Sequence, residues 1–560
     1  MKTSNPTIAY FSMEIALEDG IPTYSGGLGV LAGDLLRTAA DLGLPLVGVT
    51  LASRLGYFRQ RIIDGAQHED PEPWDPAARA ERLPCTVLVQ LEGREVWVGA
   101  WRYWLRSNCP GADSVPILLL DTDMPGNAPQ DRGITDHLYG GDAAYRLRQE
   151  AVLGLGGVRL LEALGIQVGK FHLNEGHSAL LALELLRRLR PAAGGGPDME
   201  GAVAAVRERC IFTTHTPVAA GHDRYPYALV ERTLGPTLPL PVLRSLGGAD
   251  ELNLTGLALA LSGWVNGVAK RHAETSRALY PRYQVHAVTN GVHPLTWTAA
   301  PWRALFDRHV PGWCHEPERL QRALALSDDE VLQAHRACRQ ALLSTLSPLP
   351  GGAGLSQERA TLVFARRMTA YKRPGLLFSD LERLRGIARQ LPFQIIVAGK
   401  AHPHDEEGRD AVEHLHGWAR ALAPDVPVVF VPDYRIEMAR LLVAGADVWL
   451  NTPRPPLEAS GTSGMKAALN GVPSLSVLDG WWVEGCAEGI TGWAIGAGDV
   501  EDDASHADSL YRKLEEDVLP AWHGPSQAWC GIMKSCIARN GSFFNSHRML
   551  RRYACEAYWR

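Results

Sequence analysis

The sequence predicts an α/β protein in which two Rossmann-like lobes face a central cleft, and three observations lead to this prediction. Residues 8–51 have the pattern of a strand, a glycine-rich turn, an amphipathic helix and a second strand, which is how a Rossmann-like unit begins. From Ala360 onward, four apolar strands alternate with helical runs, as in a second parallel sheet. The length of 560 residues is enough for two large domains.

Composition and charge narrow the class of protein. The sequence is 46% hydrophobic and 21% charged, which is typical of a globular chain with a large core. Its net charge of -6 gives no electrostatic reason to expect a nucleic-acid partner. The longest apolar run, residues 254–268, is interrupted by polar residues and is too short to cross a bilayer, so no membrane partner is expected. Nine scattered cysteines without a CxxC pair, together with the lack of a signal peptide, indicate free thiols and a cytoplasmic location.

The first lobe is expected to continue with hairpins and further strands. The glycine turn at residues 26–29 either permits close helix packing or turns its N–H groups toward an anion. Residues 67–121 alternate apolar and polar positions and should form antiparallel hairpins. Residues 211–222, IFTTHTPVAAGH, predict a strand that ends at His215, on the edge where α/β sheets bind ligands. Residues 253–272 predict one buried helix.

The segment FHLNEGHSAL brings His172, Glu175 and His177 close together in the sequence and raises the question of a metal site. The spacing HxxEGH is one residue longer than the inverzincin HxxEH. A strand end that enters a helix would also not hold all three side chains on one face, as a metal ion requires. The prediction is therefore that this protein has no metal site.

The second lobe carries a basic run directly after its first strand. In FARRMTAYKRP, Arg366, Arg367, Lys372 and Arg373 follow the carboxyl end of the strand that begins at Ala360. One interpretation is an exposed basic turn. The other is an anion site, because ligands of parallel sheets bind at this edge.

The stretch from Glu458 to Gly471, EASGTSGMKAALNG, places a carboxylate, hydroxyls and glycines ahead of Lys466 and a helical run. Small residues let the backbone approach a ligand, and N–H groups at the start of a helix suit an anion. A lysine there can hold a phosphate or form a Schiff base with an aldehyde cofactor. The stretch is not a Walker P-loop, because GxxxxGK[ST] is absent. The alternative is a glycine-rich turn that caps a surface helix.

These motifs resemble those of the α-glucan (glycogen/starch) phosphorylases. EASGTSGMK is similar to the pyridoxal-phosphate loop of that family, EASGTxxMK, and the glycine turn resembles GNGGLGRLA. The basic run matches KRxxxYKR, and TNGVHPLTW resembles TNGITPRRW, where the chain crosses between the lobes. The resemblance extends from about residue 8 to residue 560 and is nearest to the short bacterial branch, in which TSGMK replaces TGNMK. Because the match begins almost at Met1, without the family's usual N-terminal extension, we expect basal activity without an activating nucleotide.

The resemblance implies the glycosyltransferase-B arrangement of two lobes and the phosphorolysis of terminal α-1,4-linked glucose from a glycogen- or maltodextrin-type glucan, giving α-D-glucose 1-phosphate. It implies the α-glucan and inorganic phosphate as partners, pyridoxal 5′-phosphate as a cofactor whose phosphate relays a proton, and a homodimer as a candidate assembly. Residues 1–295 would form the N-terminal lobe with a β-hairpin insertion, and residues 296–535 the cofactor-binding lobe. Residues 536–560 would form a C-terminal helix that packs back on the first lobe.

The resemblance also assigns roles to residues. The residues expected to act in catalysis are Lys466, which would carry the Schiff base, Arg367 and Lys372, which would bind inorganic phosphate, and His215. The cofactor phosphate would be held by Thr462, Ser463, Gly27, Arg366 and Arg435, and the cofactor ring by Tyr434, Asn290 and Trp297. The glucosyl unit would contact Glu458, Ser460, Gly461, Leu28, His215 and Asn290. Ser463 replaces a family glycine, so its contact survives only if its backbone N–H is the donor.

Two alternative functions stay open. A nucleotide-sugar-dependent glucan synthase shares the two-lobe fold and a GGLG loop, but it has no need of a Schiff-base lysine at Lys466. A catalytically silent glucan-binding homologue is disfavoured, because the four residues expected to act in catalysis are all present.

Overall fold

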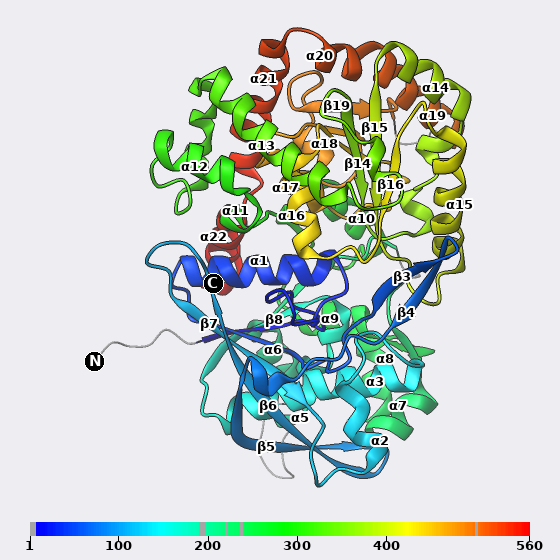
Figure 1. Cartoon of the computed structure of the whole chain (residues 1–560). Helices are drawn as coiled ribbons and strands as arrows, with labels where there is room; N and C mark the ends of the chain where they lie inside the picture. The colour runs from blue at the N-terminus through cyan, green and yellow to red at the C-terminus, as the bar shows by residue number, and fades with distance from the viewer. Residues whose placement is uncertain (1–6, 190–197, 219–220, 236–238, 499–501, 560) are drawn as a thin grey trace.

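The computed structural model describes residues 7–189, 198–218, 221–235, 239–498 and 502–559, which form two lobes, each built around its own sheet (Figure 1). The predicted α/β fold with two lobes is confirmed. Among the residues that the structure describes, none of the helices combines the length and the apolar character needed to span a bilayer.

The sheet of the N-terminal lobe has, within the described residues, nine strands in the order β13-β12-β9-β8-β1-β2-β7-β6-β5. Their bounds are β1 (Thr7–Phe11), β2 (Leu46–Leu51), β5 (Glu81–Leu91), β6 (Arg94–Arg106), β7 (Ser114–Asp121), β8 (Val168–Asn174), β9 (Cys210–Thr213), β12 (Trp264–Gly267) and β13 (His286–Ala287). Neighbours from β13 to β7 pair in parallel, whereas β5, β6 and β7 pair antiparallel. The hairpins predicted for residues 67–121 are thus confirmed as one edge of this sheet.

Two small antiparallel pairs and ten helices accompany this sheet in the described part of the lobe. The pairs are β3 (Arg59–Ile63) with β4 (Ala66–Asp70), and β10 (Arg224–Pro226) with β11 (Glu251–Asn253). The helices are α1 (Gly27–Asp41), α2 (Pro129–Arg132), α3 (Ala143–Ala151), α4 (Gly157–Ala163), α5 (Leu180–Leu189), α6 (Met199–Arg209), α7 (Tyr227–Leu234), α8 (Leu240–Gly247), α9 (Leu254–Leu261) and α10 (Lys270–Leu279).

The glycines at the start of α1 divide into two kinds. A Cβ atom on Gly29 would lie 2.6 Å from Glu14 Oε2, and one on Gly33 would lie 2.1 Å from the carbonyl oxygen of Ala16. Both glycines are therefore required by close packing of α1 against the segment that follows β1. A Cβ atom on Gly27, in contrast, would meet nothing within 4 Å. Gly27 therefore faces open space.

The prediction of one buried helix over residues 253–272 was wrong. The segment forms the helix α9, the strand β12 and the beginning of α10. Gly263 follows the helix, and a Cβ atom there would lie 2.5 Å from the carbonyl oxygen of Arg207. The apolar residues after it form β12, which pairs with β9 in parallel and places Trp264 opposite Ile211. Tertiary pairing at this edge overrides a local pattern that also suits a helix.

The sheet of the C-terminal lobe has six parallel strands in the described residues, in the order β16-β15-β14-β17-β18-β19. Their bounds are β14 (Ala360–Ala365), β15 (Phe393–Ala398), β16 (Val428–Val431), β17 (Val448–Asn451), β18 (Ser474–Val477) and β19 (Gly492–Ile495). The four strands predicted from Ala360 onward are confirmed, and β18 and β19 were missed. The segment of β18, SLSV, alternates serine with apolar residues, and β19 begins at a glycine, so neither shows the continuous apolar run that predicted the other four strands.

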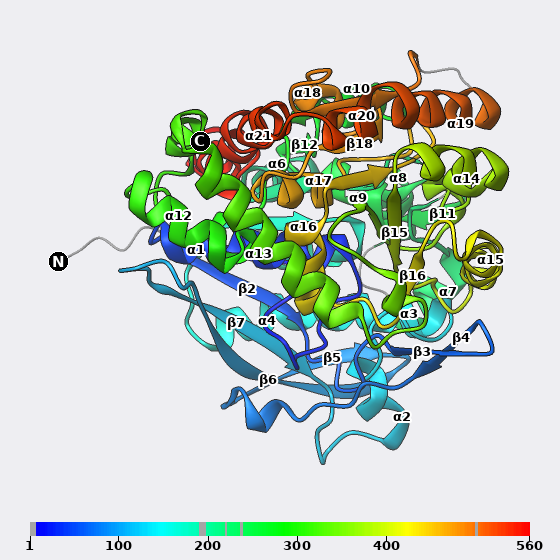
Figure 2. The same cartoon turned by 45° about the horizontal axis from the view of Figure 1, so that its top comes forward.

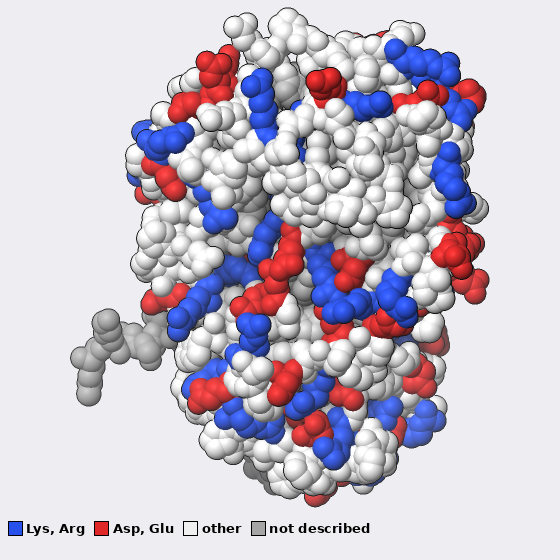
Figure 3. Space-filling view, in the orientation of Figure 1, with Lys and Arg blue, Asp and Glu red and all other residues white. Residues whose placement is uncertain are grey.

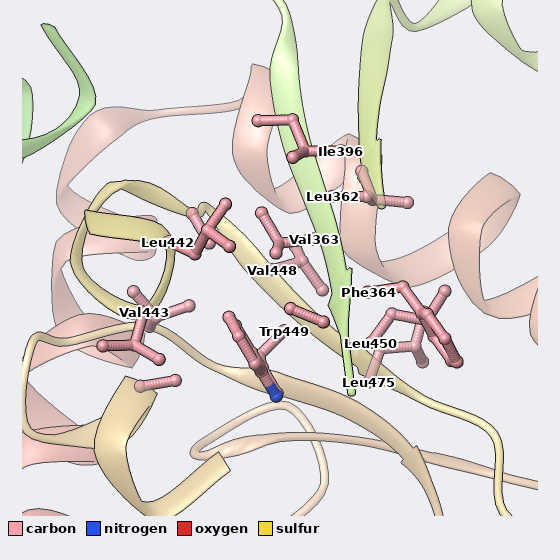
Figure 4. Packing of buried hydrophobic residues seen from close by; sticks show 14 of the residues in the cluster. Leu362, Val363, Phe364, Ile396, Leu442, Val443, Val448, Trp449, Leu450 and Leu475 are labelled. Atoms are coloured by element: carbon pink, nitrogen blue, oxygen red, sulfur yellow. The ribbon is translucent and has the colours of Figure 1, made fainter. Parts of the chain in front are cut away.

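Buried side chains pack on the faces of this sheet, as Figure 4 shows for residues of β14, β15, β17, β18 and α16. The helices of this part of the chain are α11 (Pro294–Trp297), α12 (Ala300–His309), α13 (Asp328–Leu346), α14 (Leu381–Gln390), α15 (Glu406–Leu422), α16 (Ile436–Gly445), α17 (Thr462–Ala468), α18 (Trp482–Gly485), α19 (Asp503–Arg512), α20 (Leu519–His523), α21 (Ser526–Ser535) and α22 (Ser546–Tyr553). In Figure 2, α19, α20 and α21 run along one edge of the lobe.

The last described residues return to the N-terminal lobe. Met549, Leu550 and Tyr553 of α22 belong to the same buried cluster as residues of β1 and α1. The hydroxyl of Tyr558 lies 2.7 Å from Nδ1 of His172 on β8. The domain boundaries at residues 295 and 535 stay a prediction.

Candidate active site

The carboxylate of Glu458 brings together two of the predicted basic residues. Nη2 of Arg366 donates a hydrogen bond of 2.7 Å to Glu458 Oε2, and the ammonium of Lys372 binds the same oxygen. All three side chains are buried. Burial favours the neutral carboxyl, but the charges of Lys372 and Arg366 outweigh it and lower the pKa of Glu458 to about 2. Glu458 is therefore ionised at neutral pH and shared by two cations.

Part of the Arg366 guanidinium is not paired with Glu458. Its Nε and Nη1 atoms are buried and find no hydrogen-bond partner among the described residues. Buried donors of a guanidinium are costly to leave unpaired, so this arrangement suits a further anion. Burial, then Tyr24, raise the pKa of Tyr434, while the charge of Arg366 lowers it.

Lys466 lies on α17, which begins after Gly461, a glycine in the left-handed region with φ of 83°. Its ammonium is 4.0 Å from the centre of the Trp297 ring. No ion pair of Lys466 is found in the described parts of the chain. Burial lowers its pKa to about 8, with Asp34 opposing the shift. An amine with this pKa is partly unprotonated near neutral pH and can act as a nucleophile.

The indole of Trp297 is held in place against Lys466. Its Nε1 donates a hydrogen bond of 2.8 Å to Oδ2 of Asp34 on α1. The amide of Asn470 donates to the carbonyl oxygens of both Trp297 and Lys466. Contacts from both lobes therefore hold Lys466 and the Trp297 ring in a fixed relative position.

The residues around the start of α17 present both occupied and free polar groups. Nε1 of Trp449, drawn in Figure 4, donates to the hydroxyl of Ser463 at 3.0 Å. The backbone N–H of Ser463 lies in the first turn of the helix, where it has no intrahelical acceptor. The hydroxyl of Ser460 and Oδ1 of Asn290 are buried and unpartnered among the described residues. The backbone N–H is thus the group through which Ser463 can meet a ligand. Thr462 begins the same helix.

Arg367 reaches from the C-terminal lobe to the glycine turn of the N-terminal lobe. Its Nη2 lies 3.8 Å from the place that a Cβ atom on Gly26 would take. The side chain of Arg367 and the neighbouring Gly27 are exposed, and Leu28 is half-buried. The first N–H groups of the 15-residue helix α1 and this guanidinium both attract negative charge. Together they form an accessible site for an anion.

The glycine turn is positioned by Glu14, which follows β1. Its Oε2 accepts hydrogen bonds from the backbone N–H groups of Ser25, at 2.7 Å, and Gly26, at 3.1 Å. Tyr139 donates to Oε1 of Glu14 at 3.0 Å. The carboxylate of Glu14 thus holds the glycine turn in position, and the N–H groups that follow Gly26 at the start of α1 can still bind a ligand.

His215 lies at the end of β9, as predicted, and two neighbours hold it. Its Nε2 is 2.7 Å from Oδ1 of Asn174, and its backbone N–H donates to Oε2 of Glu175 at 2.7 Å. Burial, then nearby histidines, lower the pKa of His215 well below its usual range. The ring is therefore neutral at pH 7, and because Oδ1 of Asn174 can only accept, Nε2 carries the proton and Nδ1 is the acceptor nitrogen. Glu175 adopts φ of 78° and ψ of 166°, a strained conformation of the kind that clusters at functional sites.

The segment HxxEGH does not act as one unit. The two ring nitrogens of His172 contact Tyr558 and Thr213, whereas Glu175 positions His215. The contacts of Asn174 and Glu175 to His215 were not predicted, because only the fold brings the end of β8 next to the segment after β9. Glu14 and Asp34 were missed because their partners lie in other elements.

Arg435 lies apart from the cations at Glu458. It forms ion pairs with Glu72 of the N-terminal lobe and, at 2.6 Å, with Asp433. A pocket here is lined by residues of both lobes, including Tyr24, Tyr57, Glu72, Lys400, Tyr434 and Arg435. Charged side chains of both signs gather along this boundary between the lobes in Figure 3. A contact of Arg435 with a cofactor phosphate stays a prediction.

Replacement of Glu458 by glutamine is expected to destabilise the protein at pH 7 and to increase its affinity for anions. The loss of the carboxylate leaves Arg366 and Lys372 buried without their partner, which typically costs about 3–5 kcal/mol. The folded pKa of about 2 lies below the usual value, so the stabilisation by Glu458 is present above roughly pH 4.3 and is lost toward pH 2. The difference in Tm between the Glu458→Gln variant and the unmodified protein should therefore become smaller as the pH falls through that range.

Added inorganic phosphate should raise the Tm of the Glu458→Gln variant more than that of the unmodified protein, because an anion takes the place of the carboxylate. Glu515→Gln is a matched control, since Glu515 pairs with Arg383 at the surface. Equal Tm values for Glu458→Gln and the unmodified protein at pH 7 would contradict the assignment.

Comparison with known proteins places these residues in a family. The family model described as carbohydrate phosphorylase matches residues 15–128 and 243–491. The chain is 37% identical to the maltodextrin phosphorylase of Thermococcus litoralis, over 100% of this chain and 71% of that protein. It is 36% identical to the glycogen phosphorylase of Mycobacterium tuberculosis, over 98% of this chain and 70% of that protein. With the glycogen phosphorylase of Aquifex aeolicus the identity is 35%, over 99% and 86% of the two chains.

Proposed function

Because this chain belongs to the carbohydrate phosphorylase family, as the sequence motifs predicted, we propose that it removes terminal α-1,4-linked glucose from a glycogen- or maltodextrin-type glucan by phosphorolysis, releasing α-D-glucose 1-phosphate. The observation that carries this proposal is the position of Arg367. The guanidinium lies against the start of α1 in the other lobe, where two sources of positive potential converge on accessible space. That space suits inorganic phosphate. A hydrolase or a glucan-binding protein would not need a phosphate site there.

The residues around Lys466 fit pyridoxal 5′-phosphate. Lys466 has a lowered pKa and no carboxylate partner in the described chain, and the face of Trp297 lies beside its amine. The buried, unpartnered donors of Arg366 suit a phosphate. We propose that the cofactor phosphate is held by Thr462, Ser463, Gly27, Arg366 and Arg435, and the ring by Tyr434, Asn290 and Trp297. When bound, the cofactor would supply a 5′-phosphate that exchanges a proton with inorganic phosphate near neutral pH, since a phosphate monoester has a second pKa of about 6.

The protein's own side chains would hold the reactants. Arg367 and Lys372 would bind inorganic phosphate at the glycine turn. Glu458 would orient Lys372 and would accept a hydrogen bond from a hydroxyl of the sugar. His215, neutral and fixed by Asn174, would form a hydrogen bond with the glucosyl unit, which Ser460, Gly461, Leu28 and Asn290 also contact. Burial of Lys372, Glu458, Ser460 and Asn290 would limit the access of water to the reacting carbon, so that the glucosyl unit passes to phosphate.

The bond changes follow from this arrangement. The glycosidic oxygen leaves the glucosyl C1 only when it gains a proton, and the C1 that remains has oxocarbenium character. Inorganic phosphate would donate that proton, and one of its oxygens would then form the new bond to C1. The phosphate charge also stabilises the cationic carbon during the transfer.

The test of this function is incubation of the purified protein with maltodextrin and inorganic phosphate, followed by measurement of α-D-glucose 1-phosphate. Release that depends on both substrates is expected. Glucose transfer from a nucleotide sugar without a phosphate requirement would instead favour the glucan synthase. Glucan binding without either reaction would favour the silent homologue.

The phosphate relay gives a separate prediction. Protein freed of its cofactor and rebuilt with pyridoxal, which lacks the 5′-phosphate, is expected to be inactive and to regain turnover when phosphite is added. Turnover of the complete enzyme should show a bell-shaped dependence on pH, because two facing phosphates share one exchangeable proton. Protein rebuilt with pyridoxal 5′-phosphate is the control. Full activity with pyridoxal alone would show that the cofactor phosphate serves only as an anchor.

Location and assembly also remain proposals. The nine cysteines, all of which lie in the described residues, are free thiols, which suits a reducing compartment such as the cytoplasm. A role in glycogen or maltodextrin breakdown follows from the proposed reaction, and a homodimer is proposed from the family resemblance.

A further inference from the structure

Three side chains of the kinds that bind soft metal ions meet outside the active site. Cys109 lies on the segment after β6, and Cys314 and His315 lie on the segment after α12. Sγ of Cys109 is 3.4 Å from Nδ1 of His315, and one ligand atom from each of the three residues lies within 4.8 Å of the others. A tetrahedral zinc ion, with Zn–S of about 2.3 Å and Zn–N of about 2.05 Å, separates sulfur and nitrogen by about 3.6 Å. The observed spacing therefore admits one shared ion with little movement.

A buried carboxylate is linked to this cluster through His547, which contacts both Asp41 and the carbonyl oxygen of His315. Asp41, at the end of α1, has a side chain that is 1% exposed. Its Oδ2 binds His293 and His547, at 2.8 Å each, whereas its Oδ1 is buried and has no hydrogen-bond partner among the described residues.

We propose that Cys109, Cys314 and His315 form a zinc site, with a water molecule as the fourth ligand. Two thiolates and an imidazole are the donor set that zinc prefers, and the two thiol protons pass to solvent when the ion binds. His547, which is held by Asp41, contacts the backbone of His315 and so helps to position this ligand, which is the usual role of residues around a metal ligand.

The site would join segments that are far apart in the chain. Cys109 belongs to the N-terminal lobe, and Cys314 and His315 follow the helix α12, which comes after the crossover between the lobes. The carbonyl oxygen of His315 also lies 3.1 Å from Nδ1 of His547 on α22. The helices α1, α11, α12 and α22 gather on one side of the molecule (Figure 1). A bound ion there acts as a structural clamp between the lobes, separate from the chemistry at Lys466.

A disulfide between Cys109 and Cys314 is the competing use of these residues. It would leave His315, whose ring lies 3.4 Å from Sγ of Cys109, without any part in the arrangement. The prediction of no metal site rested on the spacing of neighbouring residues, and it could not include ligands that lie 205 positions apart, as Cys109 and Cys314 do.

The test uses the full chain in its reduced, cofactor-loaded form, freed of metals and then titrated with Zn²⁺ or Co²⁺. We expect one ion per chain by elemental analysis, a rise in Tm of several degrees with Zn²⁺, and a thiolate-to-cobalt charge-transfer band with Co²⁺. Cys109→Ser, Cys314→Ser and His315→Ala should each weaken Zn²⁺ binding at least tenfold. Cys555→Ser and His404→Ala are matched controls, since both residues are exposed and lie outside the cluster.

The cobalt spectrum of the unmodified protein needs no variant, so it remains decisive if a variant fails to fold. Absence of Zn²⁺ and Co²⁺ binding by the reduced protein would overturn the proposal. So would equal binding by the unmodified protein and by both cysteine variants. A Cys109–Cys314 disulfide in protein isolated without reductant, with no metal binding after reduction, would identify the pair as a redox bridge instead.

Discussion

Replacement of Lys466 by alanine is expected to abolish cofactor binding and phosphorolysis together. The amine of Lys466 is buried against Trp297 and carries a lowered pKa, as a residue that attacks an aldehyde should. The absorption and fluorescence of purified protein report whether a pyridoxal group is bound. Borohydride reduction followed by peptide mapping should then fix the label on Lys466.

Two variants serve as controls for this prediction. Lys466→Arg keeps a positive charge against the Trp297 ring but cannot form the covalent link, so it should also be inactive. Lys513→Ala removes a lysine that pairs with Glu488 and Asp517 at the surface, and it should behave like the unmodified protein. A label on another lysine in active protein would defeat the assignment.

The pKa of Lys466 gives this prediction a dependence on pH. Only the unprotonated amine attacks an aldehyde, and the folded pKa of about 8 lies below the usual value of a lysine. The rate at which cofactor-free protein takes up pyridoxal phosphate should therefore rise with pH up to about 8 and then level off. A rate that continues to rise toward pH 10 would indicate an ordinary exposed lysine.

Replacement of Arg367 by alanine is expected to lower kcat/KM for phosphate by roughly 30- to 1000-fold while the cofactor stays bound. The loss of one charged partner of a bound anion typically costs about 2–4 kcal/mol, and each 1.4 kcal/mol corresponds to about tenfold. Lys372→Ala should have an effect in the same direction, with an additional loss of stability because Glu458 loses a partner. Steady-state rates at varied phosphate concentrations measure both effects.

The matched control for Arg367 is Arg383→Ala, which removes a guanidinium paired with Asp508 and Glu515 at the surface. Arg367→Lys should recover part of the affinity for phosphate, because the charge remains while the fork of donors is lost. Unchanged phosphate kinetics in Arg367→Ala would remove this residue from the phosphate site, whatever the state of the cofactor.

Several properties of this protein follow from local sequence patterns. The alternation of residues 67–121 predicts hairpins that the structure contains, and the four strands from Ala360 onward come from apolar runs between turn signals. The family was predicted from short motifs around Gly27, Arg367 and Lys466, and the comparisons confirm it. Such patterns are visible in one sequence because each lies within one strand, turn or helix.

What only the tertiary structure decided concerns residues that meet across the two lobes. Glu458 joins Arg366 and Lys372, Arg367 lies against Gly26, and Asp34 fixes the Trp297 ring beside Lys466. The strand β12 exists because it pairs with β9, although its sequence also suited a helix. Cys109 and His315 are 206 positions apart in the sequence and likewise approach each other only in the folded chain. Packing of distant segments creates these contacts, and no local spacing in the sequence encodes them.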